Sequence, residues 1–243
     1  MMQDSNIKEL QWDSEFFSIK IGRIDKFLIN DETFDTLLFR FIDSDYKLLY
    51  IFDDINKIQP TVNLKNCVLK EVDTKILFEK KLDAIDFKNN DEIQILNDFT
   101  LEDEIDLYNL ALESGHLSRY KTDNLFKSGE FERFYKMWIK NSLNKSIADD
   151  IFIYKENNRI EGFVSLKYSG EYCTVGLIAV SPKLRGKQIG EKLMKKCFSL
   201  GKQKGCSILY VATQLQNQGA CRFYQKFDMN INEQKKIYHL WKI

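Results

Sequence analysis

The sequence predicts an α/β (α+β) protein in which helices flank a mixed, mostly antiparallel central sheet, with a small α/β domain in front of it. Three apolar runs of strand length follow one another with only short polar turns between them, at residues 151–155, 159–168 and 172–180. This spacing is typical of an antiparallel meander. An amphipathic helix over 184–203 then leads to a buried strand over 207–213, which predicts a crossover. A helix over 218–226 and a strand over 231–242 complete the order.

Two helices are expected before the meander. Thr100 is a potential N-cap, and Asp103 three residues later resembles the second half of a capping box. Residues 131–143 carry apolar side chains on one helical face. Together with the meander, these helices define a second domain over residues 96–243.

Residues 1–95 are expected to form the small N-terminal domain. Its elements are predicted as an extended segment, a helix and a strand, at residues 19–29, 34–42 and 48–52. Two alternating runs around Val72-Asp73-Thr74 predict a hairpin over 67–78. The polar stretch 86–92 (DFKNNDE) is the predicted domain boundary.

The composition argues against proteins that bind nucleic acids or membrane surfaces through their net charge. The chain has 243 residues, 44% hydrophobic and 30% charged, which are ordinary values for a globular protein. The 36 Lys and Arg residues balance the 36 Asp and Glu residues. Because a neutral chain lacks the electrostatic footprint of a non-specific nucleic-acid or membrane-surface binder, we expect neither partner.

The start of the chain lacks the pattern of a secretory signal, and no apolar run has the length of a bilayer span, so we expect a cytoplasmic protein. The five cysteines are scattered and form no CxxC pair, which is typical of reduced thiols packed as small apolar residues. Neither His116 nor His239 has a second ligand at metal spacing. We therefore expect no metal.

The segment from Gly176 to Gly190 carries the clearest chemical signal. An apolar strand ends at Val180, Pro182 enforces an extended exit, and Gly186 and Gly190 flank a short turn into a helix. Unpaired backbone N–H groups and the helix dipole would converge there, which is how proteins bind a phosphate or pyrophosphate. Arg185 and Lys187 add positive charge. A lone glycine turn before a helix is, however, more often purely structural.

Further along, Asn217 and Tyr224 lie seven residues apart, which places them on one face of the helix expected at 218–226. Asn217 is also the natural N-cap of that helix, and Tyr224 could equally be a core aromatic residue.

The run Val180-x-Pro182-x-x-Arg185-Gly186-Lys187-x-Ile189-Gly190 resembles the acetyl-CoA pyrophosphate loop of the GNAT superfamily. The run Asn217-x-x-Ala220-x-x-x-Tyr224-x-x-Phe227 is similar to the second signature of that superfamily, and the resemblance covers roughly residues 97–243. One departure is Gln188, where the family usually has glycine. A side chain is tolerable there if the φ angle of Gln188 is negative and its amide still faces the phosphate.

The resemblance implies a GNAT fold and direct acyl transfer in a ternary complex with acetyl-CoA or another short acyl-CoA. The third strand of the meander would splay from its neighbour and bind pantetheine, and an N–H group near Ile178 would polarise the thioester carbonyl. Tyr224 would protonate the departing thiolate. The implied cofactor-binding residues are Leu177, Ile178, Ala179, Val180, Arg185, Gly186, Lys187, Gln188, Ile189, Gly190, Asn217, Ala220 and Tyr224.

Other segments point to a subfamily. They are Leu10-Gln-Trp12-Asp13-Ser-Glu-Phe16-Phe17, the run from Glu113 to Tyr120 with Tyr135-x-x-Trp138, and Val211-Ala-Thr-Gln214. These segments resemble the bacterial dTDP-fucosamine acetyltransferases. The resemblance implies N-acetylation of the 4-amino group of a dTDP-4-amino-4,6-dideoxyhexose for O-antigen or related lipopolysaccharide biosynthesis, a homodimer, and an N-terminal domain that contributes to acceptor binding.

On the acceptor side, Arg119 and Lys121 could bind the diphosphate of a nucleotide sugar, or they could be solvated loop charges. Glu71 could take the ammonium proton, although most surface carboxylates have no such role. Two alternatives stay open: a GNAT enzyme acting on another small amine or a protein N-terminus, and a non-catalytic acyl-CoA-binding module.

Overall fold

The computed structural model describes residues 7–25, 31–54, 66–83 and 92–243. By spatial proximity the chain divides into two units: Met1–Ile76 with Gln214–Gln216 and Glu233–Ile243, and Leu77–Thr213 with Asn217–Asn232. This division differs from the one predicted at residue 95, because the C-terminal strand joins the first unit and residues 77–95 join the second. Apart from Glu92, the polar stretch 86–92 lies outside the described residues.

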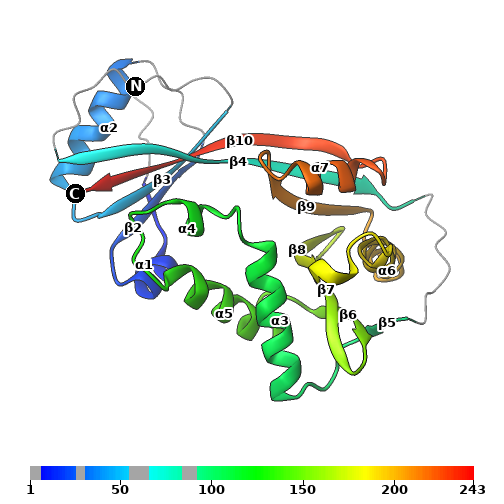
Figure 1. Cartoon of the computed structure of the whole chain (residues 1–243). Coiled ribbons are helices and arrows are strands. Elements are labelled where there is room, and N and C mark those ends of the chain that lie inside the picture. The colour runs from blue at the N-terminus through cyan, green and yellow to red at the C-terminus, as the bar shows by residue number, and fades with distance from the viewer. Residues whose placement is uncertain (1–6, 26–30, 55–65, 84–91) are drawn as a thin grey trace. The chain divides into compact units, whose positions relative to one another are not determined.

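The first unit is built on strands in the order β1-β2-β3-β10-β4 (Figure 1). Its described elements are β1 (Lys8–Glu9), α1 (Gln11–Phe17), β2 (Ile21–Asp25), α2 (Asp31–Asp43), β3 (Leu48–Asp54), and parts of β4 (Cys67–Lys81) and β10 (Asn230–Lys242). β2 runs parallel to β3, whereas β10 pairs with β3 in antiparallel register.

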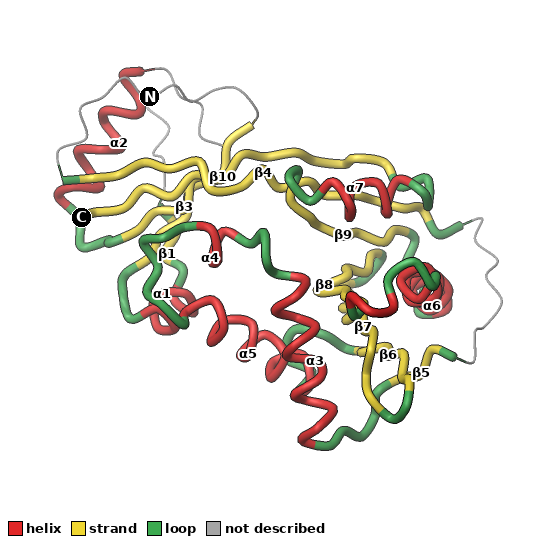
Figure 2. Tube along the Cα trace, viewed as in Figure 1, coloured by secondary structure: helices red, strands yellow, loops and turns green. Residues whose placement is uncertain are grey.

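Helix α2 covers one face of these strands (Figure 2). Its apolar stripe Phe34, Leu37, Leu38 and Phe41 packs on β2, β3, β4 and β10 side chains that include Leu240. This packing confirms the helix predicted over residues 34–42, because side chains at spacings of three and four share one helical face.

The predicted hairpin over residues 67–78 is wrong, because β4 runs unbroken from Cys67 to Lys81. The supposed turn residues Asp73 and Thr74 are buried, and the carbonyl of Thr74 accepts a hydrogen bond from the amide of Leu215. Val72 and Thr74 are β-branched, and the segment lacks the Gly, Asn or Pro that a tight turn prefers. The charged alternation therefore belongs to one long strand.

The strands of the second unit follow the order β4-β9-β8-β7-β6-β5. Its remaining elements are β5 (Ile93–Ile95), α3 (Leu101–Ser114), α4 (Arg119–Thr122), α5 (Glu130–Leu143), β6 (Asp150–Glu156), β7 (Arg159–Ser169), β8 (Tyr172–Val180), α6 (Ile189–Gln203), β9 (Ile208–Gln214) and α7 (Gln218–Gln225). The pairs β6–β7 and β7–β8 are antiparallel and β8–β9 is parallel, which confirms the meander and the crossover. Helices α3 and α5 lie on one side of β6–β8 and α6 lies on the other (Figure 1).

Local signals explain the turns of this unit. Asn157 and Asn158 both have positive φ angles, as a two-residue hairpin between β6 and β7 requires. The capping box of α3 is present, because the Thr100 side chain accepts from the amide of Asp103 while the Asp103 carboxylate accepts from the amide of Thr100. Helix α6 begins at Ile189, five residues later than the prediction.

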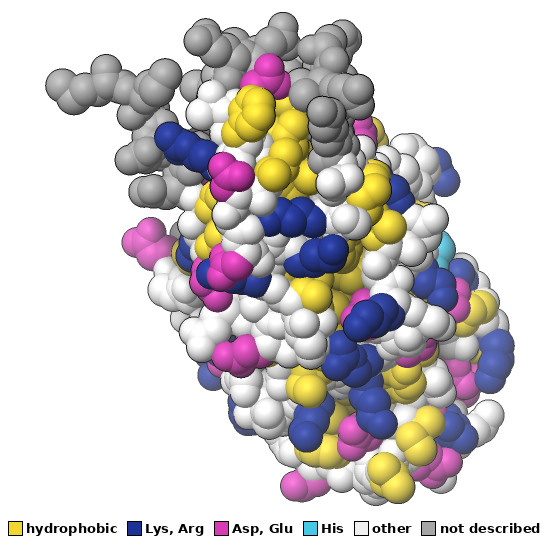
Figure 3. All heavy atoms as spheres, turned by 90° about the vertical axis from the view of Figure 1, so that its left-hand side faces the viewer, with side chains coloured by type: hydrophobic (Ala, Val, Ile, Leu, Met, Phe, Trp, Pro, Cys, Tyr) yellow, Lys and Arg dark blue, Asp and Glu magenta, His cyan; other side chains and the backbone are white. Residues whose placement is uncertain are grey.

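Basic and acidic side chains are interspersed on the face drawn in Figure 3, which agrees with the zero net charge of the sequence. Among the residues that the structure describes, none of the helices combines the length and the apolar character needed to cross a bilayer. The five cysteines all lie in the described part; all are buried and none is in a disulfide.

Candidate functional site

Strand β8 separates from β9 halfway along its length. The two strands pair in parallel from Tyr172 to Val175, opposite Ile208 to Val211. Beyond that point β8 continues to Val180 beside β7 only, with Phe163 opposite Ala179 as part of that pairing. The divergence is the splay expected for the third strand of the meander.

The separated part of β8 is accessible although it belongs to an inner strand. Gly176 is exposed, and Leu177, Ile178 and Val180 are only partly buried. Because β9 no longer pairs there, one edge of this segment is open to hydrogen bonds from an extended ligand, in the manner of strand addition.

A short loop connects β8 to α6. Ser181 is extended, as Pro182 requires, and Pro182–Leu184 forms a single 3₁₀ turn. Gly186 adopts a φ angle of +84°, which glycine tolerates without strain. Gln188 has a φ angle of +62°, so the condition of a negative angle for a side chain at this position is not met. The backbone needs a left-handed residue before α6, and Gln188 supplies it at a cost that glycine would avoid.

The N-terminus of α6 is uncapped. Gln188 occupies the N-cap position and makes no side-chain cap hydrogen bond. The first helical bond there runs from the amide of Lys192 to the carbonyl of Gln188, so the amides of the first turn have no partner within the helix. Such amides and the positive end of the helix dipole bind anions.

The basic residues of the loop form ion pairs at the surface. The guanidinium of Arg185 lies 3.0 Å from the carboxylate of Glu113 on α3, and the ammonium of Lys187 lies 3.9 Å from that of Glu156 on β6. All four side chains are well exposed, and exposed ion pairs contribute little free energy. An anion at the α6 N-terminus could therefore compete for either cation.

Gly190 lies where the segments that carry the two sequence signatures pack against each other. A Cβ atom at this position would lie 3.3 Å from the ring of Phe223 on α7 and 3.8 Å from the side chain of Val180 on β8. Glycine therefore permits the first turn of α6, the end of β8 and α7 to pack closely.

Tyr224 lies on α7 with only 3% of its surface exposed. Its ring contacts those of Phe78 and Phe223, with centroids 5.4 and 5.5 Å away. Burial raises the pKa of the Tyr224 phenol, so the hydroxyl stays protonated at neutral pH and can act as a proton donor. Asn217 is the N-cap of α7, since its side-chain oxygen accepts from the amide of Ala220 at 3.1 Å.

The predicted acceptor residues lie on α4 and β4. Arg119 begins α4, where its guanidinium donates to the Tyr120 hydroxyl at 2.8 Å and lies over the Tyr120 ring. The Lys121 ammonium lies 3.5 Å from the carboxylate of Glu132. Glu71 belongs to the first unit, on β4, and accepts a 2.8 Å hydrogen bond from Lys236.

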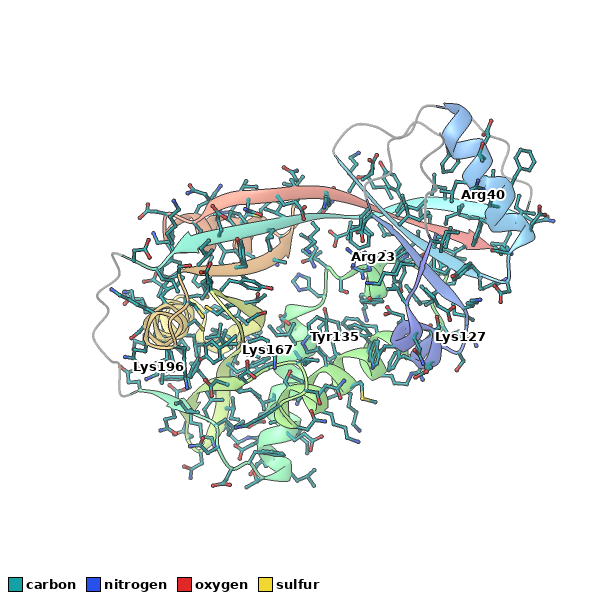
Figure 4. The ribbon with its side chains drawn as sticks, turned by 180° about the vertical axis from the view of Figure 1, so that it is seen from behind. Arg23, Arg40, Lys127, Tyr135, Lys167 and Lys196 are labelled. Carbon is teal, nitrogen blue, oxygen red and sulfur yellow. The ribbon has the colours of Figure 1, made fainter. Side chains whose placement is uncertain are left out.

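Two features escaped the sequence-based interpretation. One is an aromatic set on α4, α5 and the loop between them, formed by Tyr120, Phe126, Phe131, Phe134, Tyr135 and Trp138; Tyr135 is labelled in Figure 4. The helical spacing of these aromatics was visible in the sequence. The other is Ser165 on β7, which accepts a hydrogen bond from β8 and carries no local signal. Within the described ranges, no group of three or more His, Cys, Asp or Glu side chains is arranged to hold a metal ion.

Comparison with known proteins shows what the second unit is similar to. Residues 110–229 match the model of the acetyltransferase (GNAT) family. The match spans β8, the loop, α6 and α7, which are the elements that form the site described above.

Among curated proteins, a Bacillus subtilis protein named spore coat polysaccharide biosynthesis protein SpsD is 26% identical over 132 residues, which is 54% of this chain and 45% of SpsD. An uncharacterized N-acetyltransferase of Methanocaldococcus jannaschii is 26% identical over 123 residues, which is 48% of this chain and 51% of that protein. The chain thus spans about half the length of these two relatives.

Among solved structures, a functionally unknown conserved protein of Staphylococcus epidermidis superposes with a TM-score of 0.64 at 11% identity, over 100% of this chain and 93% of that one. At this identity the likeness concerns the fold alone. The family match over residues 110–229 and the splayed β8 agree with each other: this segment is similar to the acetyltransferase (GNAT) family, and the chain has the GNAT fold.

Proposed function

We propose that the protein is an acyl-CoA-dependent N-acetyltransferase that transfers its acyl group directly to an amine. The observation that carries the proposal is the combination, within the second unit, of the open edge of β8, the uncapped N-terminus of α6 and the buried phenol of Tyr224. The open edge of β8 can pair with an extended arm that contains amide groups. The N-terminus of α6 can bind a diphosphate, and the phenol of Tyr224 can protonate a thiolate leaving group.

The cofactor would bind from the loop toward β8. The amides of the first turn of α6 would hold the diphosphate, with Arg185 and Lys187 exchanging their surface carboxylates for phosphate oxygens. The backbone of Leu177–Val180 would hydrogen-bond the pantetheine arm. A backbone N–H near Ile178 would stabilise the negative charge that develops on the thioester oxygen.

Tyr224 would complete the reaction. As the neutral amine attacks the thioester carbonyl, the carbon–sulfur bond breaks, and the Tyr224 hydroxyl donates its proton to the departing sulfur. Burial keeps the phenol protonated at neutral pH. Asn217 would act by fixing the start of α7, on which Tyr224 lies.

For the acceptor, we propose a nucleotide-linked sugar carrying a 4-amino group, as in the dTDP-4-amino-4,6-dideoxyhexoses. Support comes from the sequence segments shared with the dTDP-fucosamine acetyltransferases and from the relative SpsD, whose name refers to polysaccharide biosynthesis. Arg119 and Lys121 are the proposed contacts to the nucleotide diphosphate. Glu71 is the proposed proton acceptor, and it would have to exchange its hydrogen bond with Lys236 for one to the substrate.

The test is release of free thiol from acetyl-CoA with a panel of amines: a dTDP-4-amino-4,6-dideoxyhexose, a polyamine, an amino acid and a peptide with a free N-terminus. Turnover with the nucleotide sugar alone is the expected result. Turnover with another amine instead would refute the sugar acceptor, and tight coenzyme A binding without turnover would identify a non-catalytic binding module.

A further inference from the structure

The point where β8 leaves β9 coincides with an irregularity between β8 and β7. Val164 lies opposite Ile178 and Leu166 lies opposite Val175, so the single residue Ser165 stands opposite two residues of β8. These two residues are Gly176 and Leu177, and they directly follow Val175, the last residue of β8 that pairs with β9.

A β-bulge of this kind bends the strand that contains the extra residue and leaves one of its backbone groups without a ladder partner. The bend lets β8 turn away from β9 while its pairing with β7 resumes at Ile178. The bulge is therefore the local cause of the open edge to which the pantetheine arm would bind.

Ser165 supplies the partner that the bulged strand lacks. Its hydroxyl oxygen accepts a hydrogen bond from the amide of Leu177 at 2.9 Å, and Ser165 itself is 1% exposed. Because a buried side chain has little freedom, this bond fixes the direction of the peptide group between Gly176 and Leu177, which is next to the peptide group that carries the N–H of Ile178.

Gly176, the first residue of the bulge, lies close to the side chain of Ser165. A Cβ atom at Gly176 would lie 2.8 Å from the hydroxyl oxygen of Ser165, which is closer than real contacts allow, and 3.9 Å from the indole nitrogen of Trp138. Glycine at this position keeps the serine hydroxyl within reach of the Leu177 amide.

We propose that Ser165 is a positioning residue for acyl transfer: by holding the amide of Leu177, it directs the neighbouring N–H of Ile178 at the thioester oxygen. The inference rests on the proposed function and deepens it. It assigns a role to Ser165, a buried residue of β7 that lies outside both signature segments.

The experiment compares Ser165→Ala, Gly176→Ala and the double variant with the wild-type enzyme. We expect Ser165→Ala to lower kcat by about 10- to 100-fold, since misplacing a group by about 1 Å can cost about 100-fold. The dissociation constant for coenzyme A, measured by calorimetry, should change by less than about threefold, because the α6 N-terminus is untouched. Ser142→Ala is the matched control, since Ser142 is buried in the same unit and its hydroxyl donates to the carbonyl of Trp138 within α5.

The double variant separates positioning from folding. Gly176→Ala alone should lower both Tm and kcat, because its methyl group collides with the Ser165 hydroxyl. Removing that hydroxyl in the double variant relieves the collision, so Tm should recover relative to Gly176→Ala while kcat stays at least tenfold below the wild-type value. Recovery of kcat together with Tm would overturn the proposal.

A second readout does not depend on turnover. In Ser165→Ala the amide hydrogen of Leu177 should exchange with solvent at least tenfold faster than in the wild type, and in Ser142→Ala it should not. Unchanged exchange, or unchanged kcat in an active enzyme, would overturn the role of Ser165 and leave the proposed function standing. A wild-type protein that transfers no acyl group would overturn both.

Discussion

Replacing Tyr224 with phenylalanine removes one hydroxyl group from the site and almost nothing else. The side chain is 3% exposed and packs through its ring against Phe78 and Phe223. Phenylalanine keeps these ring contacts, so we expect the variant to fold with a Tm within a few degrees of the wild-type value. The coenzyme A affinity should also persist, because the diphosphate site lies at the N-terminus of a different helix, α6.

The rate, by contrast, should fall steeply. A positioned proton donor contributes about 10²- to 10⁴-fold to a rate, which corresponds to about 2.7–5.4 kcal/mol of the activation barrier. Since burial raises the pKa of Tyr224, the phenol is protonated throughout the range below pH 10, its ordinary value. The kcat of the wild type should therefore show no alkaline decline from this group below pH 10.

The assay is steady-state release of coenzyme A thiol, with the Kd for coenzyme A measured separately. Tyr154→Phe, on β6, is the control for loss of a tyrosine hydroxyl in the same unit. A Tyr224→Phe variant that retains more than about a tenth of the wild-type kcat would remove Tyr224 from the mechanism. If the lower activity is accompanied by a lower Tm, the hydroxyl of Tyr224 stabilises the fold and the loss of activity does not show a catalytic role.

Three further changes test other parts of the account. Gln188→Gly should raise the free energy of unfolding by about 0.5–1 kcal/mol, because glycine adopts a φ angle of +62° without strain; chemical denaturation measures this, and coenzyme A affinity should be retained. Asp106→Asn should lower the free energy of unfolding at pH 7 and make that free energy less dependent on pH in the acidic range. The hydrogen bond from Arg159 lowers the pKa of the Asp106 carboxyl, so the stabilisation is complete above the unfolded pKa of about 3.9 and is lost as pH falls through the lower folded value. Glu71→Gln should lower kcat by about 10²- to 10⁴-fold, because an amide cannot accept the proton of the substrate amine; thiol release with saturating acetyl-CoA measures this.

Each of these changes has a contrary outcome. A Gln188→Gly variant less stable than the wild type would mean that the Gln188 side chain makes a stabilising contact of its own. An unchanged acid unfolding curve in Asp106→Asn would contradict the coupling of Asp106 to Arg159, and an unchanged kcat in Glu71→Gln would exclude Glu71 as the proton acceptor.

The parts of the site that depend on local signals could be predicted from the sequence. The loop after Val180, the cap at Asn217 and the three-strand meander each follow from residues close together in the chain: a proline, two glycines, an asparagine before a helix, and turn residues between apolar runs. The splay of β8, which the structure confirms, was expected from the resemblance to the GNAT superfamily and not from local signals.

The features that depend on distant pairing could not be predicted. The bulge at Gly176 exists only because β7 brings Ser165 opposite it. The membership of β10 in the first unit likewise depends on its pairing with β3, some 180 residues earlier in the chain. The alternating charges of β4 imitate a hairpin because period-two alternation is the same in one long strand and in two short ones.

The positive φ angle of Gln188 could not be predicted from the sequence either. Glutamine rarely adopts a left-handed conformation, and the structure places it there because the chain has to turn from β8 into α6 within a few residues.

The most direct test of the central claim is a crystal structure of the protein with coenzyme A. We expect diphosphate oxygens within hydrogen-bonding distance of the amides of the first turn of α6, the pantetheine arm along Leu177–Val180, and the sulfur within about 3–3.5 Å of the Tyr224 hydroxyl. Coenzyme A bound away from the α6 N-terminus, or a Tyr224 hydroxyl directed away from the sulfur, would contradict it.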